Sequence, residues 1–120
     1  MFKFDMKYTF EERQAESLRI RNKYPDRIPV IVEKSAKASD DLLEIDKNKF
    51  LVPSDLSWGQ FLWIIRKRLK ISSDKAIFVF ANGKLPGSAM LMANVYEEFK
   101  SSDYYLKVSY MDENTFGTSN

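Results

Sequence analysis

The fold is decided by residues 57–69, which read SWGQFLWIIRKRL. Ser57, followed three residues later by Gln60, has the pattern of a helix N-cap with its capping box, so we expect a helix from here to about Leu69. Apolar residues cover more than one side of this helix. One stripe holds Trp58, Leu62, Ile65 and Leu69, and a second holds Phe61, Ile64 and Arg68. A helix on a single sheet buries one stripe, so the second is either covered by another layer or left exposed to bind a partner.

Strand-like segments lie on both sides of this helix in the chain. We expect strands at residues 28–33, 49–53, 76–80 and 104–110, a polar connection over residues 34–48, a turn at Asn82-Gly83 and a short helix near residues 90–99. Alternation in the last strand predicts one face made of Tyr104, Leu106, Val108 and Tyr110. A polar helix is expected from an N-cap at Thr9 to about Lys23.

The order of these elements indicates the fold class. A strand pair, a helix that crosses one face of the sheet and two further strands form the β-grasp arrangement of ubiquitin. The sequence therefore predicts an α+β, ubiquitin-like β-grasp with a four-stranded mixed sheet, to which amino-terminal helical structure is added.

Composition narrows the classes of function. The chain of 120 residues has the length of one domain, carries a net charge of +2, and contains neither cysteine nor histidine. A thiol nucleophile, a disulfide and the usual zinc ligands are therefore excluded, and the balanced charge does not indicate nucleic acid. Basic runs at residues 19–23 and 66–70 are either solvated helix faces or docking surfaces for acidic partners or anionic lipid. We expect no cofactor, no metal, no signal peptide and no membrane-spanning segment.

Several longer stretches resemble one known family. They are Phe10 to Arg13, Lys23 to Lys34, Phe50 to Leu56, Gly59 to Phe61, Ile65 to Arg68 and Glu113 to Gly117. In this order and over almost the whole chain, they resemble the autophagy ubiquitin-like modifiers, in the branch of the GABA-receptor-associated protein and its fungal counterpart. The resemblance implies a β-grasp with amino-terminal helices. It suggests a helical extension packed on the domain over residues 1–26, a ubiquitin-like domain over 27–111 and a flexible tail over 112–120.

The resemblance also implies a function in which the protein is a substrate and not an enzyme. A cysteine protease would cut after Gly117, and activating and conjugating enzymes would pass the new carboxylate to phosphatidylethanolamine. Glycine suits this chemistry because it lacks a Cβ and lets narrow active sites approach its carbonyl. Phe116 would be gripped by these enzymes. The expected locations are the cytoplasm and, after lipidation, the membranes of autophagosomes and cytoplasmic vesicles.

Receptors and adaptors with an aromatic-x-x-Leu/Ile/Val motif are the partners that the resemblance implies. Such peptides add a strand to a sheet edge, here residues 49–52, with Lys49 and Leu51 pairing with the peptide backbone. The aromatic anchor would enter a pocket of Glu16, Ile20, Pro29, Lys47, Leu51 and Tyr105. The aliphatic anchor would enter a pocket of Phe50, Val52, Pro53, Leu56, Phe61, Ile64 and Arg68, which would give the second stripe of the 57–69 helix a role. Acidic residues beside the motif would meet Arg27, Lys47, Lys49 and Arg68.

Two other functions are compatible with the residues. An adaptor of the same fold that is never conjugated would act in trafficking or bind the cytoskeleton, with the basic amino-terminal helix on acidic tubulin tails. A small enzyme would use the carboxylates of Asp40, Asp41 and Glu44, although an acidic loop offers no dry site that would shift their pKa values. Phe2 and Phe4 either touch a membrane after conjugation or pack on the domain.

Overall fold

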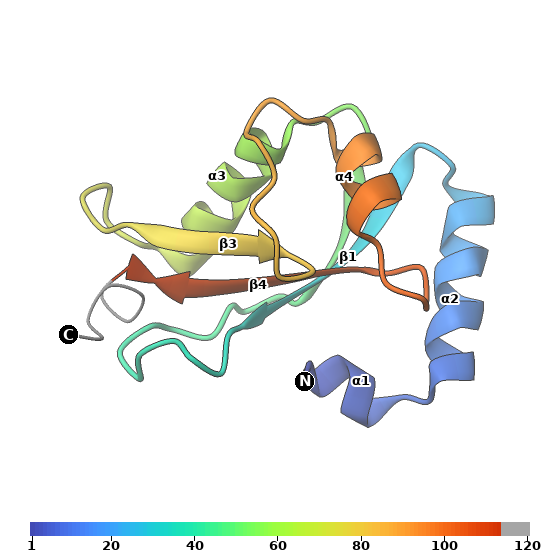
Figure 1. Ribbon diagram of the computed structural model, residues 1–120, viewed down its shortest axis with the longest axis horizontal. Helices are drawn as coiled ribbons and strands as arrows, with labels where there is room; N and C mark the ends of the chain where they lie inside the picture. Colours follow the sequence, from blue (N-terminus) through green and yellow to red (C-terminus); the bar gives the residue numbers. More distant parts are fainter. Residues whose placement is uncertain (114–120) are drawn as a thin grey trace.

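A four-stranded mixed sheet is the centre of the structure. The computed structural model describes residues 1–113, and its elements are α1 Lys3–Lys7, α2 Phe10–Lys23, β1 Arg27–Lys34, β2 Lys49–Pro53, α3 Trp58–Leu69, β3 Ile77–Ala81, α4 Met92–Phe99 and β4 Leu106–Asp112 (Figure 1). The strand order is β2-β1-β4-β3. β1 runs parallel to β4, while β2 and β3 pair antiparallel to their neighbours. This confirms the predicted β-grasp.

Helix α3 crosses one face of the sheet and closes the main core. Its capping box is formed as predicted, because Ser57 accepts a hydrogen bond from the Gln60 backbone and Gln60 accepts one from the Ser57 backbone. The helix ends at Lys70, which has the left-handed conformation of a C-cap, with φ of 55°. Side chains from β1, β2, β4 and α4 complete the core, including Val30, Val32, Phe50, Val95, Leu106 and Val108.

The second stripe of α3 is covered more fully than its pattern suggests. The Phe61 side chain is 0% exposed, and its ring packs edge-on against Phe50 and tilted against Trp58. Of the two alternatives for this stripe, the covered one is found at Phe61, since these two aromatic neighbours pack against it. Ile64 is half-buried, and the large apolar side chain that α3 leaves in solvent is Trp63, 61% exposed.

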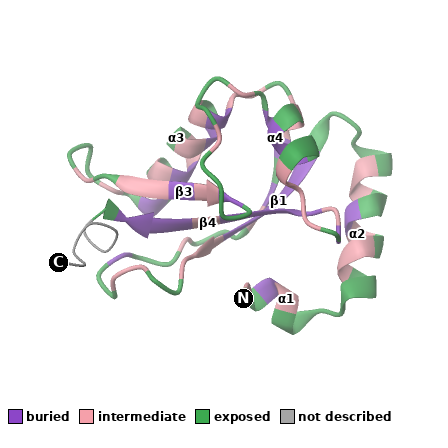
Figure 2. Cartoon of the chain, viewed as in Figure 1, coloured by how far each residue is buried: buried purple, intermediate pink, exposed green. Residues whose placement is uncertain are grey.

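The amino-terminal helices lie on the other face of the sheet (Figure 1). Thr9 is the N-cap of α2 as predicted, and it also forms a capping box with Glu12; yet the buried side chain of α2 is Ser17, while Leu18 is exposed. Figure 2 shows the contrast between the buried central strands β1 and β4 and the mostly exposed α2. Apolar contact on this face comes from Phe4 of α1, which packs with Ile31 and Tyr105. Phe4 thus packs on the domain.

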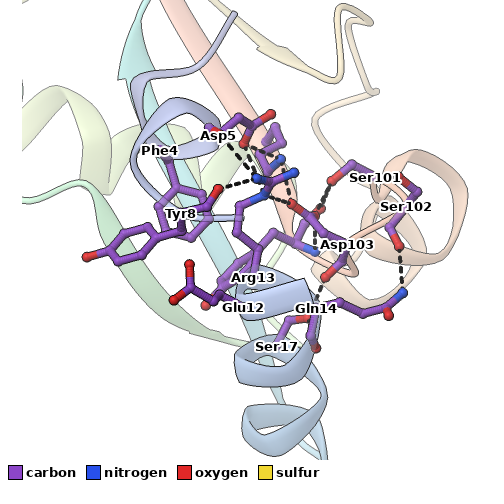
Figure 3. A network of polar contacts seen from close by, with 12 residues as sticks. Phe4, Asp5, Tyr8, Glu12, Arg13, Gln14, Ser17, Ser101, Ser102 and Asp103 are labelled. Atoms are coloured by element: carbon purple, nitrogen blue, oxygen red, sulfur yellow. Dashed lines mark hydrogen bonds and ion pairs between the residues drawn. The ribbon is translucent and has the colours of Figure 1, made fainter. Parts of the chain in front are cut away.

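Charged and polar groups attach these helices to the sheet (Figure 3). Arg13 donates to the Asp103 carboxylate at 2.7 Å and to the Asp5 and Tyr8 carbonyl oxygens. The Ser17 hydroxyl donates to the Asp103 carbonyl. The buried Lys107 ammonium lies 2.8 Å from the Asp5 carboxylate and 3.0 Å from that of Asp103. A network of ion pairs therefore replaces most of the apolar interface that a helix ordinarily offers.

The last strand begins later than predicted. Tyr104 lies outside β4 and has a positive φ of 65°. The backbone makes a tight turn here, because Tyr104 N–H donates to the Ser101 carbonyl and Tyr105 N–H donates to the Asp103 carboxylate. Tyr104 is therefore not part of the core face formed by Leu106, Val108 and Tyr110. The turn at Asn82-Gly83 is confirmed, with positive φ at both residues. Within residues 1–113, no helix is long and apolar enough to cross a membrane.

Candidate functional site

Strand β2 is one edge of the sheet and leaves one side of its backbone open. It pairs with β1 alone, and Leu51 stands opposite Pro29 in the register. Proline has no N–H to donate, so this position suits a pair in which the two residues exchange no backbone bonds. The N–H and C=O of Leu51 then point away from β1, and those of Lys49 do the same two residues earlier. This edge can accept an additional strand.

Side chains of β2 alternate between the two faces of the sheet. Phe50 and Val52 are buried in the core beneath α3. Lys49 and Leu51 face the side of α2, where Lys49 is half-buried and Leu51 is 39% exposed. The open edge is thus flanked by two different environments, one bounded by α2 and one by α3.

On the α2 side, three of the predicted residues join in one polar cluster. The Lys49 ammonium donates to the Glu16 carboxylate at 2.6 Å, and the Tyr105 hydroxyl donates to the same oxygen. Burial raises the pKa of Glu16, but the hydrogen bonds from Lys49 and Tyr105 together leave it below its ordinary value. Burial and then the hydrogen bond to Glu16 raise the pKa of Tyr105. Glu16 is therefore held as a carboxylate and Tyr105 as a neutral donor.

The other residues predicted for the aromatic pocket either are partly or fully buried or lie elsewhere. Pro29 is buried and Ile20 is half-buried. Lys47 lies elsewhere, with its ammonium 5.1 Å from the centre of the Phe50 ring. Its position is therefore on the α3 side of the edge and not with Glu16.

On the α3 side, cations gather around one aromatic ring. The guanidinium of Arg68 lies 5.9 Å from the Phe50 ring centre, and its Nε pairs with Asp46 at 3.1 Å. A hollow of about 390 Å³ opens next to them, lined by Asp46, Ile64, Lys67, Arg68 and Lys70. Pro53 and Leu56 are half-buried. Ile64 and Arg68 thus line an open hollow, whereas Val52 and Phe61 lie beneath the surface as core.

Some contacts near this edge involve a residue that the sequence analysis did not place in the peptide site. Phe4 packs edge-on against Tyr105 at 4.9 Å, and its ring centre is 5.6 Å from the Lys49 ammonium. A second hollow of about 400 Å³ lies between α1 and residues 44–49. The sequence signal for Phe4 was the pair of aromatic residues Phe2 and Phe4 at the amino terminus, which indicated either membrane contact or packing on the domain. Arg27 is exposed, and its guanidinium reaches the Leu51 carbonyl at 3.5 Å.

The predicted carboxylate enzyme gains no support from the positions of its residues. Asp40, Asp41 and Glu44 are all exposed, and Glu44 pairs with Lys3 at 3.7 Å in solvent. Exposed carboxylates lack the dry surroundings that general acid catalysis needs. Phe116 and Gly117, the predicted processing site, lie outside the described residues.

Known proteins resemble this chain over nearly its whole length. The family description "Autophagy protein Atg8 ubiquitin like" matches residues 12–117. "Autophagy-related protein 8" of Schizosaccharomyces pombe is 58% identical over 111 residues, which are 92% of this chain and 90% of that protein. "Autophagy-related protein 8A" of Oryza sativa subsp. indica is 55% identical over 116 residues, covering 97% and 96% of the two chains.

A solved structure agrees with the fold as well. The crystal structure of Trypanosoma brucei ATG8 superposes with a TM-score of 0.86 at 41% identity, covering 98% of this chain and 99% of that one. The sequence match and the mixed sheet with its amino-terminal helices point the same way. The chain therefore belongs to the Atg8 family of autophagy-related, ubiquitin-like proteins.

Proposed function

We propose that this protein is a conjugated modifier of autophagic membranes. A cysteine protease cuts after Gly117, activating and conjugating enzymes carry the exposed carboxylate, and the amine of phosphatidylethanolamine accepts it. The observation that carries the proposal is the family match, which extends along the chain to Gly117. The protein is the substrate of these steps and needs no catalytic residue of its own. It moves from the cytoplasm to autophagosomal or other vesicle membranes when the lipid is attached.

The second half of the proposal concerns recruitment. On the membrane, the open edge of β2 receives a receptor or adaptor peptide with an aromatic-x-x-aliphatic motif as an added strand. Support comes from the open edge at Leu51, from the polar cluster of Glu16, Lys49 and Tyr105 on the α2 side, and from the hollow beside Ile64 and Arg68 on the α3 side. The aromatic residue enters beside Glu16, Lys49 and Tyr105, and the aliphatic residue enters beside Ile64 and Arg68. Acidic residues that flank the motif meet the cations Arg27, Lys47 and Arg68.

A reconstituted conjugation assay tests the first half. Protein ending at Gly117 is mixed with activating and conjugating enzymes, ATP and liposomes containing phosphatidylethanolamine, and Gly117→Ala is the matched control. A liposome-bound product of altered mobility that forms only with Gly117 supports the proposal. If no product forms with folded protein while a relative is conjugated in parallel, the adaptor that is never conjugated becomes the better explanation, and tubulin the partner to test first.

Mass spectrometry after treatment with the family protease gives a second test. A precursor loses residues 118–120 and no others, whereas a plain adaptor keeps its mass. Cleavage at another bond would contradict the assignment of Gly117.

A further inference from the structure

Helix α1 places one aromatic side chain, that of Phe4, against residues of the proposed aromatic pocket. Phe4 is 6% exposed and packs with Tyr105 and Ile31, which are both fully buried. Its ring meets the Tyr105 ring edge-on at 4.9 Å and lies 5.6 Å below the Lys49 ammonium. Tyr105 and Lys49 are the two donors that hold Glu16. Phe4 therefore lies against both donors to the pocket carboxylate.

The position of Phe4 depends on contacts outside α1. A helix of five residues is far too short to persist alone in water. Glu33 of β1 accepts hydrogen bonds from the backbone N–H groups of Lys3 and Phe4 at 2.8 and 3.0 Å. The Asp5 carboxylate pairs with the buried ammonium of Lys107 at 2.8 Å. These contacts from the sheet hold α1 against it, together with the bonds from Arg13 to the carbonyl oxygens of Asp5 in α1 and of Tyr8, the residue after the helix (Figure 3).

We infer that docked α1 preorganises the peptide-binding edge. In this arrangement Phe4 is a positioning residue for the side chains of Tyr105 and Lys49. Asp5 attaches α1 to the sheet and so keeps Phe4 in place. This inference rests on the peptide-binding function proposed above. A peptide that binds when α1 is docked finds both donors already ordered. When α1 is released, the Tyr105 ring loses a supporting neighbour, Lys49 loses the aromatic face beneath it, and binding has to order both side chains again.

The size of the effect follows from the cost of ordering side chains. Immobilising one or two loosened side chains on binding weakens affinity by about fivefold in Kd. Linkage then requires the reverse effect, in which bound peptide favours docked α1 by the same factor. Amide exchange at Lys3 and Phe4 reports α1 docking, because both N–H groups are bonded to Glu33 only while the helix is docked.

The experiment compares three variants of the full chain with wild type. Phe4→Ala removes the ring, and Asp5→Ala removes the attachment while Asp103 still pairs with Arg13 and Lys107. Met6→Ala is the matched control, since Met6 lies in the same helix and is 72% exposed. The probe is a synthetic acidic peptide that contains Trp, two Glu and Leu in that order. Calorimetry gives Kd, and hydrogen exchange of α1 is measured with and without peptide.

The expected result has three parts. Phe4→Ala and Asp5→Ala bind the peptide about fivefold more weakly, Met6→Ala binds within about twofold of wild type, and saturating peptide slows exchange of the wild-type Lys3 and Phe4 amides by about fivefold. A melting curve for each variant establishes that it is folded. If a variant does not fold, the exchange measurement on wild-type protein still decides the matter.

Two results would overturn the inference, and they differ in what else they remove. If wild type binds the peptide but exchange in α1 is unchanged and Asp5→Ala keeps its affinity, α1 does not organise the edge, although the peptide-binding proposal stands. If wild type does not bind the peptide at all, both the binding proposal and the inference built on it are wrong.

Discussion

Replacing Asp103 by Asn tests whether ion pairs hold the amino-terminal helices in place. Asp103 is 1% exposed and takes hydrogen bonds or ion pairs from Arg13 at 2.7 Å, Ser101 at 2.6 Å, Lys107 at 3.0 Å and the Tyr105 N–H at 3.1 Å. The amide keeps one acceptor oxygen but loses the charge. Breaking a buried pair costs about 3 to 5 kcal/mol, and we expect about 3 kcal/mol here, because Lys107 retains Asp5.

The acidity of Asp103 depends on the same ion pairs. Burial raises its pKa, but bonds from Ser101, Arg13 and Lys107 bring it down to about 2 from an ordinary 3.8. Since the folded state binds the proton more weakly, the charged carboxylate adds about 2 kcal/mol of stability above pH 4. This contribution is lost as the pH falls from about 4 to about 2. Substitution costs more than protonation because the Asn amide group is placed beside two cations.

Urea denaturation measures both effects. With a slope of about 2 kcal/mol per molar, Asp103→Asn lowers the midpoint at pH 7 by about 1.5 M, and the difference from wild type shrinks between pH 4 and pH 2. Glu97→Gln is the control, since it breaks the exposed pair with Lys100, and should cost no more than about 0.5 kcal/mol. A midpoint shift for Asp103→Asn as small as that of the control, or one that does not change with pH, would refute the reasoning.

Other predictions concern the edge and the helix start. At moderate salt, Leu51→Ala weakens peptide binding by about 2 kcal/mol or more, whereas Lys47→Ala changes mainly the association rate; equal losses in a titration would contradict this order. Tyr105→Phe removes the hydroxyl that donates to Glu16, so we expect the free energy of unfolding to fall by about 1 kcal/mol and the pKa of Glu16 to rise. An NMR titration measures this pKa, and an unchanged value would contradict a role for the hydrogen bond. Thr9→Ala removes the α2 capping box and costs about 1 kcal/mol in a thermal melt, so an unchanged melt would contradict the cap.

Local signals predicted most of the fold. The Thr9 N-cap and the Ser57/Gln60 capping box mark the starts of α2 and α3, and apolar runs mark β1 and β3 within a residue or two. Tyr104 was misplaced because its strand pattern continues through a turn that Asp103 and Ser101 hold by hydrogen bonds. Such side-chain bonds to the backbone override alternation, and no periodicity in the sequence reveals them.

The candidate site was predictable in part. Alternation along β2 places its residues on the correct faces, and the Pro29 partner of Leu51 is consistent with an open edge. Helical spacing left open whether Phe61 is covered or exposed, because it cannot tell whether a side chain from another element lies against it. Here the Phe50 ring of β2 lies against it. The placement of Phe4 depends on how α1 packs on the sheet, which is a property of the tertiary structure.

One residue in the sequence does point to the ion-paired layer. Lys107 lies in a central strand, between the core residues Leu106 and Val108, so alternation turns it to the opposite face. A lysine there is buried by whatever covers that face, and a buried ammonium requires carboxylate partners. No neighbouring strand supplies one at that position, since Ile31 is its partner in β1. Acidic groups must then come from a segment outside the sheet, and Asp5 of α1 is one of them. A charged residue between core residues of a central strand is therefore a signal that a separate polar segment docks on the opposite face, and it predicts the layer that the weak apolar pattern of α2 conceals.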